Sequence, residues 1–476
     1  MKLLLPSRHW HPHNFAPVSP VTSKLSTLNS IHFIAIGGAA MHNLALALHH
    51  QGYQVTGSDD EIKEPSRSRL AAAGLLPAKE GWFPEKLESK PGAVILGMHA
   101  RADNPELLKA QELGLKVYSF PEYFYEQSKD KTRVVIGGSH GKTSITSMIM
   151  HVLKTLGKDF DYMVGSTVEG FDTMVRLSDS APFIILEGDE YLSSPIDRRP
   201  KFHLYKAHIA LLSGIAWDHI NVFPTFDNYV EQFRIFADQL PDQGQLVWYA
   251  GDPELKQIAS RLRESVNRTS YDVPEYTIEN GVTVVKFEGE KFPLAVFGKH
   301  NLANLEGARE VCKLLGVGGK EFYRAAQSFK GAGRRLELVA QTPNRTIFRD
   351  FAHSPSKLKA TMDAVREQFP DRKLIGCFEL HTFSSLSENF LEQYAGTTLG
   401  ADVPLVYFNP AVVAHKKLAP VSATKVKNAF ADQRVFVSTD PEVLRELIVQ
   451  EFTPGSVLLM MSSGTFDGID IKGLLV

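Results

Sequence analysis

The chain has 476 residues, of which 43% are hydrophobic, 22% charged and 10% aromatic. This length predicts two to four domains and excludes a single small binding module, while the apolar content excludes disorder over most of the chain. The 52 basic and 54 acidic residues nearly cancel, which excludes a global electrostatic attraction to nucleic acid or to an anionic membrane.

Residues 1–30 carry Pro, Ser, Thr and His without hydrophobic periodicity, and we expect a loosely ordered extension there. The three leucines after Lys2 are too few for the apolar core of a signal peptide, and no apolar run reaches the length of a membrane span. We therefore expect a cytoplasmic protein without a membrane or nucleic-acid partner. Cys312 and Cys377 form no CxxC pair, so we expect two buried thiols.

Short β-branched runs alternate with helical patterns in three successive blocks, which is typical of an α/β fold with parallel sheets. We expect a Rossmann-like N-terminal domain over 31–130, a central domain with a parallel sheet over 131–331, and a Rossmann-like C-terminal domain over 332–476. The strands are predicted at 31–36, 53–56, 93–97, 134–136, 183–186, 209–212, 374–378, 405–408, 435–437 and 457–461.

The first block carries a glycine turn between its first strand and a helix that runs to His50. The candidate ligand-binding residues are those of this turn and of the end of the next strand: Gly37, Gly38, Ala39, Ala40, Met41, Ser58 and Asp59. The spacing of Gly37 and Asp59 also suits a dinucleotide. However, the G-x-G-x-x-G pattern would need glycines at Ala35 and Ala40, so an NAD-dependent oxidoreductase is disfavoured.

The second block opens with a strong phosphate-binding signal directly after an apolar strand. The loop and first helical turn comprise Gly138, Ser139, His140, Gly141, Lys142, Thr143 and Ser144. Backbone N–H groups of such a turn face phosphate oxygens, the lysine reaches the β- and γ-phosphates, and the threonine hydroxyl faces Mg²⁺. A helix with one apolar stripe follows and ends at Gly157. The central domain is therefore predicted to be P-loop ATPase-like.

Acidic and imidazole side chains follow two further strands of this block. Glu187 begins the run Glu-Gly-Asp-Glu, and His219 follows Asp218 after the next strand. Ligands bind at the carboxyl ends of strands in open parallel sheets, so we expect Glu187 and His219 near the phosphate loop. Together with Thr143 they are the predicted ligands of Mg²⁺ that assists phosphoryl transfer from ATP.

The chain resembles the Mur ligase family, which consists of three-domain ATP-dependent amide-bond ligases. The resemblance extends over about residues 31–476 and rests on motifs that occur in the family order. These are Gly37 to Met41, Gly138 to Thr143, Glu187 to Glu190, Asp218-His219, Gly298 to Asn301 with Asn304, Gly333 to Arg335, and Asp350 to Pro355.

The resemblance implies that ATP phosphorylates the carboxylate of UDP-N-acetylmuramate, and that an amine then attacks the acyl phosphate. It implies catalytic roles for Lys142, Glu187, His219 and Arg335. It implies ATP contacts by Asn301, Asn304, Arg335 and Asp350 besides the phosphate loop, and UDP-sugar binding by the first-block residues. Strand-end residues of the third block are the expected amine site: Glu379, His381, Ser462 and Gly464.

Two amine substrates remain open at this point. The run from Glu187 to Tyr191 and the segment from Met461 to Gly468 resemble the members that attach the tripeptide L-alanyl-γ-D-glutamyl-meso-diaminopimelate. The segment from Glu379 to Ser384 resembles instead the members that attach L-alanine. The motifs favour the tripeptide, hence peptidoglycan recycling. A more distant alternative is a P-loop ATPase switch without ligase activity, and the polar strand ends of the third block disfavour it.

Overall fold

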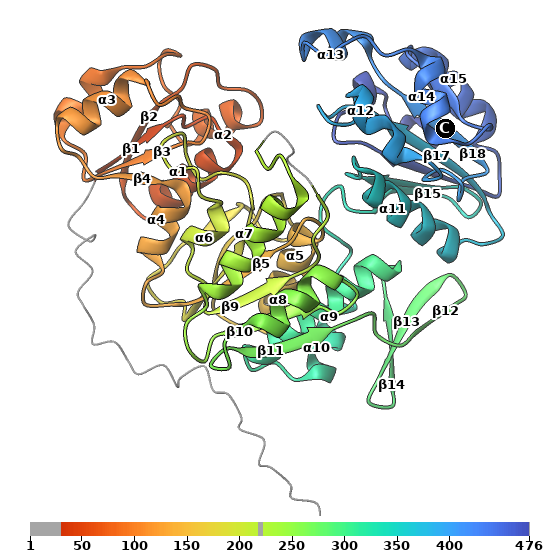
Figure 1. Ribbon diagram of the computed structural model, residues 1–476, viewed down its shortest axis with the longest axis horizontal. Helices are drawn as coiled ribbons and strands as arrows, with labels where there is room; N and C mark the ends of the chain where they lie inside the picture. The colour runs from red at the N-terminus through yellow and green to blue at the C-terminus, as the bar shows by residue number, and fades with distance from the viewer. Residues whose placement is uncertain (1–29, 218–221, 476) are drawn as a thin grey trace, which may run out of the picture. The chain divides into compact units, whose positions relative to one another are not determined.

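The computed structural model describes residues 30–217 and 222–475, and the chain divides into two compact units (Figure 1). The first unit comprises the chain up to Asp272 together with Asn304–Ala325, and the second comprises Val273–Ala303 and Ala326–Val476. Except for Ser30, the predicted N-terminal extension lies outside the described residues. In the described part of the chain, no helix has both the length and the apolar character needed to cross a membrane.

The N-terminal part of the first unit is a four-stranded parallel sheet with the order β2-β1-β3-β4. Ile31 and Phe33 of β1 pack into one hydrophobic cluster, whereas Ile34 packs into a second cluster, so both faces of the sheet are covered. The elements are β1 (Ser30–Ile34), α1 (Ala39–His50), β2 (Gln54–Ser58), α2 (Ser66–Ala72), η3 (Pro84–Ser89), β3 (Ala93–Leu96), α3 (Pro105–Glu112), β4 (Val117–Ser119) and α4 (Phe120–Gln127).

The rest of the first unit surrounds a seven-stranded sheet with the order β11-β10-β9-β5-β8-β6-β7, in which only the β6–β7 pair is antiparallel. Helix α5 packs against β5 and β8, and α8 packs against β10 (Figure 1). The elements are β5 (Thr132–Gly137), α5 (Lys142–Thr155), β6 (Asp161–Met163), β7 (Val175–Arg176), β8 (Phe183–Glu187), α6 (Lys201–Leu204), β9 (Ile209–Leu212), α7 (Phe226–Asp238), β10 (Gln245–Tyr249), α8 (Pro253–Arg261) and β11 (Asn267–Tyr271).

The order of this sheet fixes where a ligand can bind. The chain passes from β5 to β6 and β7 on one side, returns through β8, and then continues with β9 on the other side of β5. The strand order therefore reverses at β5, and the carboxyl ends of β5, β8 and β9 meet at one edge. Open α/β sheets bind their ligands at such a switch point.

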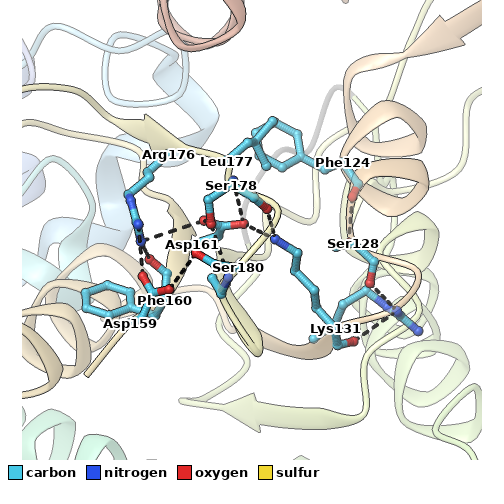
Figure 2. Close-up of polar contacts among 12 residues, drawn as sticks. Phe124, Ser128, Lys131, Asp159, Phe160, Asp161, Arg176, Leu177, Ser178 and Ser180 are labelled. Atoms are coloured by element: carbon cyan, nitrogen blue, oxygen red, sulfur yellow. Dashed lines mark hydrogen bonds and ion pairs between the residues drawn. The ribbon is translucent and has the colours of Figure 1, made fainter. Parts of the chain in front are cut away.

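A buried polar network fixes the segment that leads into β5 (Figure 2). The Lys131 ammonium donates to the Asp161 carboxylate and to the carbonyl of Ser178. Asp161 is fully buried and also accepts the Ser178 N–H at 3.0 Å and the Ser178 hydroxyl at 2.7 Å. The Arg133 guanidinium donates to the Ser128 carbonyl at 2.7 Å. The connection before the phosphate loop is therefore held against the edge of the sheet.

The second unit contains a three-stranded antiparallel sheet and a six-stranded sheet with the order β15-β16-β20-β17-β18-β19. Only the β15–β16 pair of the larger sheet is antiparallel. Along β20, Val457 and Leu459 face one hydrophobic cluster while Leu458 and Met460 face the other. This alternation places helices on both faces of a buried sheet.

The elements of the second unit are β12 (Tyr276–Glu279), β13 (Val282–Phe287), β14 (Glu290–Leu294), β15 (Glu337–Gln341), β16 (Thr346–Asp350), α11 (Pro355–Gln368), β17 (Lys373–Glu379), α12 (Glu388–Leu391), η4 (Glu392–Tyr394), β18 (Val403–Tyr407), α13 (Pro410–His415), α14 (Ala423–Phe430), β19 (Phe436–Ser438), α15 (Pro441–Glu451), β20 (Ser456–Met461), η5 (Phe466–Gly468) and η6 (Gly473–Leu475). Helix α9 (Lys299–Leu314) continues from the second unit into the first, and α10 (Gly319–Ala326) follows it.

The α/β class and the parallel sheets predicted from the sequence are confirmed, and so is each of the predicted strands. Cys312 and Cys377 are buried free thiols, as expected.

Candidate active site

The phosphate loop joins β5 to α5 and depends on two glycines with positive φ. Gly138 has φ +132°, and a Cβ there would collide with the Ser213 hydroxyl; Gly141 has φ +79°. Other residues adopt such angles only at a cost, so glycine is required at this tight turn. The Ser139 N–H donates to the Gly214 carbonyl at 2.9 Å, which anchors the loop on the segment after β9.

Lys142, the first residue of α5, makes a buried ion pair. Its ammonium donates to the Gly138 carbonyl at 2.7 Å and to the Glu190 carboxylate at 2.6 Å. The Glu190 side chain is 1% exposed and the Lys142 side chain 16%. Burial opposes the charged ammonium, but the negative charges of Glu190 and Asp189 outweigh it and raise the pKa of Lys142. The lysine therefore keeps its positive charge beside the loop.

Glu187 ends β8 and lies directly against the phosphate loop. Its carboxylate accepts the Thr143 hydroxyl at 2.9 Å and the backbone N–H of Gly165 at 2.7 Å. Two residues later, Asp189 pairs with Lys201 at 2.6 Å. Burial alone would raise the pKa of Asp189. The positive charges of Lys201 and Lys142 have the larger, opposite effect and hold that pKa well below its ordinary value. Glu187 and Thr143 thus meet at the predicted edge.

The hydroxyl and carboxylate oxygens of Thr143 and Glu187 are hard donors of the kind that Mg²⁺ prefers, so the donor set suits this ion. The third predicted ligand, His219, lies outside the described residues. Within the ranges 30–217 and 222–475, no group of three His, Cys, Asp or Glu side chains is arranged to hold a metal ion.

The two asparagines predicted to contact adenine lie on α9 but have different surroundings. Asn304 lies against the phosphate loop, because a Cβ on Gly141 would collide with its amide oxygen. Asn301 is 7% exposed, and its amide donates to the Phe297 carbonyl at 3.0 Å, just before the helix. Asn301 therefore has a structural hydrogen bond at the start of α9, while Asn304 faces the predicted nucleotide site.

The glycine turn of the first sheet lies between β1 and α1, at another reversal of strand order. Gly38 is the N-cap of α1, Ala39 and Ala40 are exposed in its first turn, and Met41 is buried. Asp59 accepts the Gly37 N–H at 2.7 Å. Burial raises the pKa of Asp59 to about 6. The exposed helix start suits an anion such as a diphosphate.

Lys86 was not predicted from the sequence but lies beside this turn. Its ammonium donates to the Ser58 hydroxyl and to the Gly57 carbonyl, each at 2.9 Å. It comes from η3, which has no motif and no apolar period that would have drawn attention to it. A cation here adds to the positive potential at the start of α1.

The four residues predicted for the amine site meet at the carboxyl ends of β17 and β20. Glu379 is 3% exposed, accepts the Phe466 N–H at 2.9 Å, and accepts the Ser462 hydroxyl. His381 lies 3.5 Å from its other carboxylate oxygen. The Gly464 N–H donates to Ser462 at 2.6 Å, and a Cβ on Gly464 would lie 2.7 Å from His381. The result is a compact polar site with a buried carboxylate.

The segment Gly333 to Leu336 precedes the same sheet. Asp350 ends β16, and its carboxylate accepts the N–H groups of Leu336 and Ala352, each at 2.6 Å. Burial raises the pKa of Asp350 despite these bonds. The guanidinium of Arg335 stacks over the Phe351 ring at 4.7 Å, and Arg334 donates to the Gly464 carbonyl at 2.6 Å. Asp350 therefore fixes the backbone that carries both arginines.

Three family models match successive parts of the chain. "Mur ligase family, catalytic domain" matches residues 30–132, "Mur ligase middle domain" matches 136–312, and "Mur ligase, glutamate ligase domain" matches 334–464.

Individual relatives match most of the chain. A UDP-N-acetylmuramate–L-alanine ligase of Limosilactobacillus reuteri is 30% identical over 79% of this chain and 84% of its own length. An Escherichia coli UDP-N-acetylmuramate–L-alanyl-gamma-D-glutamyl-meso-2,6-diaminoheptandioate ligase is 27% identical over 93% and 97%. The crystal structure of a murein peptide ligase from Psychrobacter arcticus 273-4 has the same fold, with a TM-score of 0.63, 24% identity, and coverage of 94% and 98%.

Proposed function

Because the chain belongs to the Mur ligase family and is an ATP-dependent amide-bond ligase, we propose that it joins the carboxylate of UDP-N-acetylmuramate to the amine of L-alanyl-γ-D-glutamyl-meso-diaminopimelate. The observation that carries the proposal is the meeting of Lys142, Thr143 and Glu187 at the switch point of the seven-stranded sheet. A phosphate loop at this edge can activate a carboxylate, which is otherwise a poor electrophile.

In the proposed first step, a carboxylate oxygen of the sugar attacks the γ-phosphorus of ATP, and the bond to ADP breaks. The loop N–H groups and the Lys142 ammonium hold the phosphates and stabilise the negative charge that spreads over the γ-phosphoryl oxygens. Mg²⁺ bound by Thr143 and Glu187 would supply further neutralisation of that charge. Positioning and electrostatics are sufficient for this step, and no covalent intermediate with the protein is needed.

In the proposed second step, the amine of the incoming peptide attacks the acyl phosphate carbon, phosphate leaves, and an amide forms. The Glu379–His381 site is the proposed amine site, since a buried carboxylate favours a neighbouring cation and an adjacent imidazole can accept the proton that the amine loses. Contacts of Arg335 and Asp350 with ATP, and of Ser58 and Asp59 with the UDP-sugar, remain predictions of the resemblance.

The tripeptide is proposed over L-alanine because the motifs at 187–191 and 461–468 resemble the members that attach it. Alignment length does not separate the two candidates, since relatives named for either substrate match more than 90% of this chain. Two observations favour L-alanine as the second candidate substrate. A relative named for L-alanine is 30% identical to this chain, and the segment from Glu379 to Ser384 resembles the members that attach L-alanine.

One assay separates these functions. The purified protein receives ATP, Mg²⁺ and UDP-N-acetylmuramate, with L-alanine in one tube and the tripeptide in another, and amide products are identified by mass spectrometry. Amide formation in the tripeptide tube at a higher kcat/KM supports the proposal. A preference for L-alanine would replace the tripeptide with the second candidate. ADP formation with ATP alone, equal to that with all substrates, would contradict ligase function.

A further inference from the structure

Tyr229 is a fully buried residue of α7 that reaches the phosphate loop from a distant part of the sequence. Its ring packs against Phe223 and Phe233, with centroids 5.4 and 5.2 Å away. Its hydroxyl lies 2.9 Å from a Glu190 carboxylate oxygen and 2.9 Å from the Ser139 hydroxyl. Packing on both sides fixes the ring, so the hydroxyl is held at a defined place.

The directions of these hydrogen bonds follow from the chemistry of the groups. An ionised carboxylate only accepts, so the Tyr229 hydroxyl donates to Glu190 and must accept from the Ser139 hydroxyl. Ser139 in turn accepts the backbone N–H of Ala216 at 2.9 Å. The other oxygen of Glu190 accepts from the Lys142 ammonium at 2.6 Å. Two donor paths therefore converge on the Glu190 carboxylate, one from the segment after β9 through Ser139 and Tyr229, and one from the loop lysine.

These hydrogen bonds orient the Glu190 carboxylate, and the position of that carboxylate decides where the Lys142 ammonium lies. A buried carboxylate held by one partner can rotate, whereas one that accepts on both oxygens has a fixed plane. We propose that Tyr229 is a positioning residue for phosphoryl transfer, which acts on Lys142 through Glu190. The inference rests on the proposed role of Lys142 at the ATP phosphates, and it adds a residue that no phosphate-loop motif contains.

The test is a cycle of variants assayed for kcat and for the KM of ATP with all substrates present. Tyr229→Phe removes the hydroxyl and keeps the ring. Glu190→Gln removes the charge that holds Lys142, and the double variant combines both. Tyr271→Phe is the matched control, because Tyr271 is also buried and its hydroxyl has no hydrogen-bond partner among the described residues. Melting temperatures of all variants are measured in parallel.

Tyr229→Phe is expected to lower kcat about tenfold, the rate equivalent of one hydrogen bond to a charged group. The KM of ATP should change less than about threefold, and Tyr271→Phe should leave both constants unchanged. Because Tyr229 acts through Glu190, the double variant should be no slower than Glu190→Gln alone. A wild-type kcat for Tyr229→Phe, or losses that multiply in the double variant, would overturn the inference.

Two further variants keep the result decisive. If Tyr229→Phe does not fold, Ser139→Ala serves in its place, because it removes the donor to the Tyr229 hydroxyl. A kcat loss of about threefold is expected for Ser139→Ala. An unchanged kcat would overturn the inference.

Lys142→Ala separates the role proposed for Tyr229 from the proposed function. Activity in Lys142→Ala contradicts the proposed function itself, whereas an inactive Lys142→Ala beside a fully active Tyr229→Phe contradicts only the role of Tyr229.

Discussion

Replacement of Lys142 by alanine should abolish ligase activity and also lower the melting temperature. A second substitution, Glu190→Gln, should restore the melting temperature but not the activity. The Glu190 carboxylate that pairs with Lys142 is 1% exposed. Removal of the ammonium leaves this charge buried without its cation, which costs about 3–5 kcal/mol when one partner of a buried pair is lost. At roughly 2–4 °C per kcal/mol for a domain of this size, the melting temperature should fall by roughly 6–20 °C.

The double variant Lys142→Ala/Glu190→Gln removes the uncompensated charge as well. Its melting temperature should return to within about 3 °C of the wild type, because a neutral amide can still accept the Tyr229 hydroxyl. Its ligase activity should stay absent, because no cation replaces the ammonium at the phosphates. Lys158→Ala, at an exposed lysine just after the same helix, should change neither property.

Differential scanning fluorimetry measures the melting temperatures, a coupled assay measures ADP formation, and calorimetry measures binding of UDP-N-acetylmuramate. The dissociation constant of the nucleotide sugar should stay within about threefold in both variants, since its predicted contacts lie at the glycine turn of the first sheet and not on the phosphate loop. ADP formation by Lys142→Ala, activity of the double variant without its lysine, or loss of nucleotide-sugar binding in either variant would contradict the proposed role of Lys142.

Three other variants test different parts of the structure. Lys131→Met removes the close ammonium partner of the fully buried Asp161 carboxylate and leaves it only the longer, 3.8 Å ion pair with Arg176, so urea unfolding should show a loss of about 3 kcal/mol, and an unchanged midpoint would contradict it. Burial lowers the pKa of His203 to about 4, so protonation of the unfolded chain makes this residue contribute about 2 kcal/mol to the loss of stability between pH 7 and 5, and His203→Gln should reduce that loss by this amount. Glu379→Gln should raise the KM of the amine but not of ATP, and equal effects on both would argue against an amine site.

The parts of the fold that a short sequence window encodes were predicted well. Most of the predicted strands are apolar runs buried along nearly their whole length, as in β5, β9 and β20, and such a run reads as a continuous apolar segment. Strand β5, the phosphate loop, Lys142 and helix α5 follow one another in the single stretch Thr132–Thr155. By contrast, β6 and β7 have only three and two residues, too few to show any period.

The candidate site was predictable only where its residues belong to motifs. Thr143 and Glu187 were expected together because parallel strands end at one edge, and the structure places them 2.9 Å apart. Tyr229 and Lys86 come from elements without a motif, and only the folded chain brings them to the two turns. Asn301 and Asn304 both lie on α9, but periodicity cannot show that the Asn301 amide donates a hydrogen bond to the Phe297 carbonyl.

The central claim is that ATP activates the sugar carboxylate by direct phosphorylation, and an isotope experiment tests it most directly. UDP-N-acetylmuramate carrying ¹⁸O in its carboxylate is ligated by the enzyme, and the released phosphate is analysed by ³¹P NMR. An acyl phosphate must break between the carbonyl carbon and the bridging oxygen, so phosphate should leave with one ¹⁸O atom, and Lys142→Ala should yield none. Release of unlabelled phosphate together with the amide would contradict the account.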